Sequence, residues 1–94
     1  PLSRFPWVRR DLSLLVPEGM AYAEIEAVVR QTAGKLFRSV NLFDVYTDES
    51  AGTTSYAIAI QLQDAEKTLQ DKAIDKTIQR VRDQLSQRLG VTMR

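Results

Sequence analysis

The sequence predicts an α+β domain in which strands and helices follow one another in the order β-α-β-β-α-β. Residues 8–16 and 54–63 alternate apolar and polar side chains with the period of two that a half-buried strand requires. Residues 21–33, and the segment from Ile74 to Leu89, carry apolar side chains at helical spacing instead. A chain of 94 residues is long enough for one core of two packed layers and too short for two cores. We therefore expect residues 1–94 to form a single domain.

The first strand and the first helix have clear boundaries. Alternation along 8–16 directs Leu12, Leu14 and Val16 to one face and Asp11, Ser13 and Leu15 to the other. A turn containing Pro17 and Gly19 ends the strand. Gly34 follows the helix, at a position where glycine commonly ends helices.

The middle of the chain is predicted to form two strands joined by a short connection that contains Gly52. Residues 36–47 carry apolar side chains on both faces, which indicates a bulge or burial on both sides. In the strand over 54–63, the inward set is Tyr56, Ile58, Ile60 and Leu62, and the outward set is Ser55, Ala57, Ala59, Gln61 and Gln63.

The second helix carries one apolar stripe, made by Ile74, Ile78, Val81, Leu85 and Leu89. Gly90 stops it, and residues 91–94 form a short last strand. The complete order is the ferredoxin-like, or split βαβ, arrangement. With right-handed crossovers, both helices cover one face of a four-stranded antiparallel sheet. The other face is open, and we expect function there.

Composition excludes several classes of function. The net charge is +1, so bulk charge predicts neither strong nucleic-acid affinity nor attraction to membranes. Histidine and cysteine are both absent, and the four glycines do not form a phosphate-binding loop, so we expect no catalytic residue, metal or cofactor in this domain. No apolar run reaches the roughly 18 residues of a membrane helix, and no signal peptide is present. Because the chain begins with Pro1, we expect a cytoplasmic domain excised from a longer polypeptide.

The candidate binding residues are arginines and a tryptophan placed around the open face. They are Arg4, Trp7, Arg9, Arg10, Arg38 and Arg94. Arginine can hold phosphates or stack on bases. The outward positions of the two central strands carry no aromatic residue, so the aromatic platform of RNA-recognition motifs is not predicted.

Other interpretations of the same residues stay open from the residues alone. Ala57 and Ala59 could pack against a neighbouring domain, which makes the chain an interdomain or protein-docking module. Trp7 could cover the edge of the core, and an arginine beside Asp11 could form a structural ion pair. A small-ligand regulatory domain is a third alternative, since this fold hosts many functions.

Five motifs in register resemble a known family. They are FP..RRDL at 5–12, LFDVY at 42–46, the stretch that opens at Ser55, TL.D at 68–71 and LG.T.R at 89–94. Together they resemble the ferredoxin-fold anticodon-binding domain at the carboxyl end of the phenylalanyl-tRNA synthetase β chain. Within these motifs we assign core positions to Phe43 and Val45. The chain has Thr53 and Thr54 where members of the family often carry a lysine.

The resemblance implies that the domain contacts the anticodon stem-loop of tRNA(Phe), as part of a ligase used in protein biosynthesis. It implies that the parent enzyme is an α2β2 assembly, and that the rest of the β chain and the α chain are partners. The aminoacylation chemistry, with ATP, magnesium and phenylalanine, is then expected in the α chain. This domain by itself is expected to be no enzyme.

Overall fold

The computed structural model describes residues 5–94, and within them the predicted order of elements is confirmed. The elements are β1 (Val8–Val16), α1 (Tyr22–Ala33), a short 3-10 helix η1 (Gly34–Leu36), β2 (Phe37–Asp48), β3 (Thr53–Leu62), α2 (Asp71–Leu89) and β4 (Thr92–Met93). The predicted boundaries agree with these to within one or two residues. Arg4, one of the candidate binding residues, lies outside the described residues.

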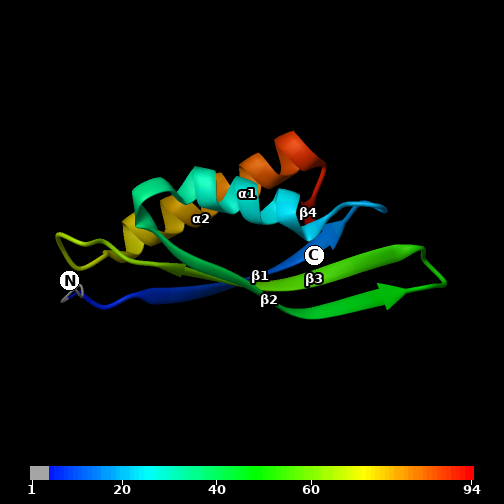
Figure 1. Ribbon diagram of the computed structural model, residues 1–94, viewed down its shortest axis with the longest axis horizontal. Helices are drawn as coiled ribbons and strands as arrows, with labels where there is room; N and C mark the ends of the chain where they lie inside the picture. The colour runs from blue at the N-terminus through cyan, green and yellow to red at the C-terminus, as the bar shows by residue number, and fades with distance from the viewer. Residues whose placement is uncertain (1–4) are drawn as a thin grey trace.

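The strands form one antiparallel sheet in the order β2-β3-β1-β4. Both helices lie on the same side of this sheet (Figure 1). The predicted ferredoxin-like arrangement is therefore confirmed. In the part of the chain that the structure describes, no helix or strand covers the opposite side of the sheet, which we call the open face.

The core lies between the sheet and the helix pair, as the alternation patterns predict. Leu14 of β1, Ile25 of α1 and Leu85 of α2 are all 0% exposed. Ile58, Ile60 and Leu62 supply the inward side of β3 and are equally buried. Burying a side chain of this size contributes about 1.5–3 kcal/mol, so these contacts between layers hold the sheet against the helices. No helix within residues 5–94 is long and apolar enough to cross a membrane.

The chain reversal at the end of α2 places the last strand beside the sheet. Gly90 has a φ of 68°, the left-handed conformation that only glycine adopts without strain. The N–H of Gly90 donates to the carbonyl of Ser86 at 3.0 Å, the 5→1 bond of an αL cap, and the N–H of Val91 donates to the carbonyl of Leu85 at 3.2 Å. The chain then reverses, and the backbone N–H of Arg94 donates to the carbonyl of Ser13 at 2.9 Å. Arg94 thereby reaches the sheet beside β1.

Strand β2 contains two bulges, which confirms one of the alternatives that its mixed pattern predicted. The register with β3 shifts between Phe37 and Ser39, and again between Leu42 and Asp44. Phe43, inside the second shift, is 53% exposed, so the expected core position is wrong for this residue.

The expected core position of Val45 is also wrong, because its side chain is 52% exposed. Val45 pairs with Tyr56, on the side of the sheet that carries the helices. The β2–β3 hairpin extends beyond the end of the helix layer (Figure 1). Val45 itself belongs to β2, an edge strand of the sheet.

Candidate nucleic-acid interface

The open face is built from the outward positions of three strands. It contains Arg9, Asp11 and Ser13 of β1, Ser55, Ala57, Ala59 and Gln61 of β3, and Arg38, Ser39, Asn41, Phe43 and Tyr46 of β2. Arg94 and Trp7 join it from outside these strands. Its main feature is a set of three arginine–aromatic pairs, each of which crosses β3.

The middle pair joins Arg9 to Phe43. The Arg9 guanidinium forms a two-pronged ion pair with Asp11, through Nε to Oδ1 at 2.7 Å and Nη2 to Oδ2 at 3.3 Å. Its central carbon also lies 5.3 Å from the centroid of the Phe43 ring, within cation–π range. Because β3 separates β1 from β2, the Arg9 side chain must cross β3 to reach this ring. The structural ion pair considered for this region therefore involves Arg9.

The second pair joins Arg38 to Trp7 at the end of the face where β1 begins. The Arg38 guanidinium lies 5.2 Å from the centroid of the Trp7 ring. Its Nε donates to Gln61 at 3.0 Å and its Nη1 to Gln63 at 3.1 Å. Trp7 is 45% exposed, so it does not serve as a lid on the core.

The third pair joins Arg94 to Tyr46 at the opposite end. Arg94 Nη1 donates to the hydroxyl of Ser55 at 2.7 Å, and its guanidinium lies 5.7 Å from the centroid of the Tyr46 ring. Tyr46 is 54% exposed, whereas Ser55 is 8% exposed. Arg94 therefore covers Ser55 and leaves much of the Tyr46 ring accessible.

Small side chains on β3 suit the crossing made by Arg9. Ala59 pairs with Asp11 on one side and with Asn41 on the other, and it is only 6% exposed although it lies on the open face. A larger side chain at this position would occupy the space through which Arg9 reaches Phe43. The small outward side chains of β3 thus leave room for the Arg9 guanidinium.

Arg10 is placed differently from the expectation that it lies at the rim of the open face. The alternation that buries Leu12 also turns Arg10 toward the helices, where it lines a groove with Asp75 and Ile78 of α2. Its Nη1 donates to the carbonyl of Arg9 at 2.9 Å. The structure therefore brings Trp7, Arg9, Arg38 and Arg94 to the open face and separates Arg10 from them.

The aromatic members of this face, Phe43 and Tyr46, are not among the binding residues predicted from the sequence. The central strands carry no outward aromatic residue, as expected, but the edge strand β2 supplies two. The signal was the mixed pattern of LFDVY. A bulge inside that motif reverses which side chains point outward.

The hairpin end of the open face also carries a stabilised carboxylate. Hydrogen bonds from the Ser50 hydroxyl (2.7 Å) and the Ala51 N–H (3.2 Å) lower the pKa of Asp48 below its usual range, and Arg94 adds to this effect. Asp48 is therefore an anion at neutral pH, and it holds the turn that joins β2 to β3.

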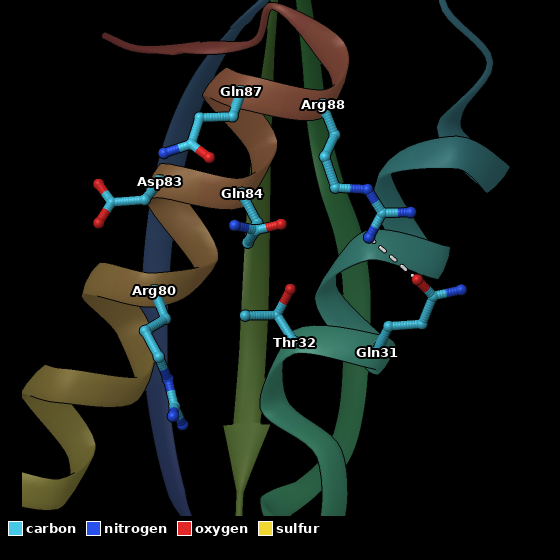
Figure 2. Close-up of a pocket in the computed structure, with 7 residues that line it drawn as sticks. All are labelled: Gln31, Thr32, Arg80, Asp83, Gln84, Gln87 and Arg88. Carbon is cyan, nitrogen blue, oxygen red and sulfur yellow. Dashed lines mark hydrogen bonds between the residues drawn. The ribbon is translucent and has the colours of Figure 1, made fainter.

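A second candidate location is the groove between α1 and α2, with a volume of about 430 Å³. Figure 2 shows its polar lining, including the hydrogen bond of 3.0 Å from Arg88 Nη1 to Gln31 Oε1. Arg80, Asp83 and Gln87 around it are exposed helix side chains. Within residues 5–94, no cluster of three or more potential metal ligands is present. The open face, with its ordered cationic and aromatic groups, is the stronger candidate for binding.

What such a face can do follows from its chemistry. Unpaired RNA bases stack on aromatic rings and on the planes of arginine side chains, and arginine N–H groups hold phosphates. Exposed Trp7, Phe43 and Tyr46 with three ordered guanidinium groups provide both kinds of contact.

Comparison with known proteins agrees with this chemistry. The family described as ferredoxin-fold anticodon binding domain matches residues 3–94. The chain is 45% identical over 95 residues to the phenylalanine–tRNA ligase beta subunit of Porphyromonas gingivalis, and 42% identical over 96 residues to that of Methylococcus capsulatus. It is 46% identical over 79 residues to the same subunit of Xanthomonas oryzae pv. oryzae.

These alignments cover most or all of this chain, at 99%, 100% and 82% respectively. They cover only 12%, 12% and 10% of the relatives, so the chain spans a small part of their length. The family match, in contrast, extends over almost every residue. The chain belongs to the ferredoxin-fold anticodon-binding domain family.

Proposed function

We propose that this chain is the anticodon-binding domain of a phenylalanine–tRNA ligase beta subunit, and that its open face contacts the anticodon stem-loop of tRNA(Phe). The choice of the open face as the contact surface rests on its row of three arginine–aromatic pairs. The relatives named above support the assignment to this enzyme. The residues proposed to contact RNA are Trp7, Arg9, Arg38 and Arg94, together with Phe43 and Tyr46. The contact expected of Arg4 stays a prediction.

The proposal extends to the parent enzyme. A ligase of this kind joins phenylalanine to tRNA with ATP and magnesium, and we place that chemistry in the α chain of an α2β2 assembly in the cytoplasm. The domain would then act by holding tRNA in position, at the carboxyl end of the β chain. Membership of an anticodon-binding family does not favour the alternative of a docking module without RNA contact.

Titration of the chain with a labelled anticodon stem-loop of tRNA(Phe) tests the proposal. We expect anisotropy to report binding that is tighter than to an unrelated stem-loop. Affinity should fall with salt, with a slope of about −0.7 for each phosphate contact to single-stranded RNA. Absence of binding at low salt would refute RNA binding, and equal affinity for both stem-loops would refute recognition of the anticodon.

A further inference from the structure

At the Trp7 end of the open face, two side chains hold the arginine of the pair, whereas Asp11 holds Arg9 and Ser55 holds Arg94. Arg38 is held there by two side-chain amides, Gln61 and Gln63, which both lie on the open-face side of β3 and its continuation. Gln61 Oε1 accepts a second bond, from the Ser39 hydroxyl at 2.9 Å. The Arg38 guanidinium is thus fixed from two directions while it lies over the Trp7 ring.

The same network holds the segment that carries Trp7. Gln63 Nε2 donates to the backbone carbonyl of Phe5 at 2.7 Å, while Gln63 Oε1 accepts from Arg38 at 3.1 Å. Gln63 therefore links the segment before β1 to Arg38, and Trp7 lies between Phe5 and the strand. One amide thus binds the Arg38 guanidinium and the backbone of the segment that carries the indole.

Exchange of the oxygen and nitrogen positions in either side-chain amide would break hydrogen bonds. Gln61 accepts from Arg38 and Ser39 through Oε1, and a flip would oppose its NH₂ group to the N–H of Arg38, which can only donate. Gln63 uses its oxygen toward Arg38 and its nitrogen toward Phe5, so a flip would break both bonds. The arrangement of the stack is therefore determined by its partners.

We propose that Trp7 and Arg38 form a stacking site for one unpaired RNA base, and that Gln61 and Gln63 are positioning residues that hold this site ready. The inference rests on the proposed function, since it assumes that RNA binds the open face. A base stacks either on the exposed part of the indole or on the outer surface of the guanidinium plane.

The hydrogen-bonding capacity that remains suits a nucleotide. Arginine has five N–H donors, and Arg38 uses two of them, toward Gln61 and Gln63. Three remain for a phosphate oxygen or a base carbonyl at the edge of the stack. A lysine could supply positive charge here, but it has neither a planar group on which a base can stack nor the paired N–H donors of a guanidinium.

The intrinsic fluorescence of Trp7 gives a direct test, because Trp7 is the only tryptophan in the chain. The anticodon stem-loop of tRNA(Phe) is titrated while anisotropy of a label on the RNA and emission of Trp7 are both followed. We expect quenching of Trp7 that follows the same binding curve. If anisotropy shows no binding, the proposed function fails and the base site fails with it. If RNA binds and the emission does not change, the base site alone is wrong.

A stem-loop whose loop nucleotides lack their bases separates stacking from phosphate contact. It keeps every phosphate, so we expect weaker binding without quenching of Trp7. Quenching equal to that by the intact loop would show that Trp7 responds to the RNA backbone, and would overturn the proposal.

Variants test the positioning role. Gln61→Met removes the acceptor for Arg38 at similar volume, and Gln61→Glu keeps it. We expect Gln61→Met to reduce the quenching at saturating RNA and to weaken binding about fivefold or more, the lower limit for loss of one stacked base. Gln61→Glu should restore most of the quenching at saturation. Equal quenching in both variants and the unsubstituted chain, with unchanged melting temperatures, would refute the positioning role.

Discussion

Arg9 and Arg10 are neighbours in sequence, but their side chains lie on opposite faces of β1. Arg9 pairs with Asp11 and Phe43 on the open face, and Arg10 lies in a groove beside α2. The two residues carry the same charge at nearly the same point of the chain. Substitutions of Arg9 and Arg10 therefore form a matched test of which face of the sheet binds RNA.

Arg9→Ala is expected to weaken binding of the anticodon stem-loop and to make the slope of log affinity against log salt shallower by about 0.7 for a lost phosphate contact. Arg10→Ala should change neither quantity, because Arg10 lies on the side of the helices. Anisotropy titrations at several salt concentrations measure both. The double variant Arg9→Ala/Asp11→Ala controls for the carboxylate left unpaired. Equal losses in the two single variants would show that the open face is not the binding surface.

Ser55→Ala tests how Arg94 is held. The Ser55 hydroxyl is nearly buried and accepts from Arg94 at 2.7 Å. Its removal is expected to lower the free energy of unfolding by about 1 kcal/mol, the usual net value of one hydrogen bond. Urea denaturation measures the change. Ser13→Ala is the control, since Ser13 is exposed on the same face; an equal loss there would contradict the role given to the Arg94 bond.

Tyr22→Phe tests a buried hydroxyl. Among the described residues the Tyr22 hydroxyl has no hydrogen-bond partner, while its ring packs edge-on against Tyr56. Because an unsatisfied buried hydroxyl is unfavourable, we expect Tyr22→Phe to retain the stability of the chain or to raise it by up to about 1 kcal/mol. A loss above that size would mean that the hydroxyl is satisfied in solution.

The same residue predicts a dependence on alkaline pH. Burial, and next the charge of Glu26, raise the pKa of Tyr22 above its usual value of about 10. Tyr22 thus ionises more readily in the unfolded chain, and its contribution to stability is lost as the pH rises through the folded-state pKa. Melting temperatures above pH 9 should fall less steeply for Tyr22→Phe than for the unsubstituted chain. Tyr46→Phe, at an exposed ring, is the control, and parallel curves for Tyr22→Phe and the unsubstituted chain would contradict the prediction.

Asp48 predicts the opposite dependence, at acid pH. The Ser50 hydroxyl, with the Ala51 N–H and Arg94, lowers its pKa, so its contribution is present above the unfolded-state pKa and is lost as the pH falls through the folded-state pKa. In Asp48→Asn the side-chain oxygen still accepts both hydrogen bonds, but the titrating group is gone. We expect the melting temperature of this variant to fall less between neutral and acid pH, with Glu49→Gln as the control. A larger fall in Asp48→Asn would contradict the assignment.

The fold could be predicted from the sequence because its elements have regular periods. The apolar residues that alternate along 8–16 and 54–63 face the core, and so do those that recur at helical spacing in the two helices. The same rule also places Arg10, since a residue two before Leu12 shares its face. The alternation therefore contradicts the expectation that Arg10 lies around the open face together with Arg9.

The aromatic half of the open face could not be predicted in this way. In β2 the period of two is broken twice, near Arg38 and at Phe43, and the position of a bulge depends on pairing with β3. The arginine–aromatic pairs across the strands could not be predicted either, because they too depend on how the strands pair. Arg94 and Tyr46 are distant in sequence, and only the sheet order brings them together.

The bulges of β2 have a further consequence for how copies of the chain behave together. β2 is an edge strand of twelve residues, and a long regular edge is a template for strand addition and aggregation. The shifts near Arg38 and at Phe43 interrupt its outward row of backbone donors and acceptors. An incoming strand would find no uninterrupted ladder there, so the irregularity that turns Phe43 outward also protects the domain against edge-to-edge polymerisation.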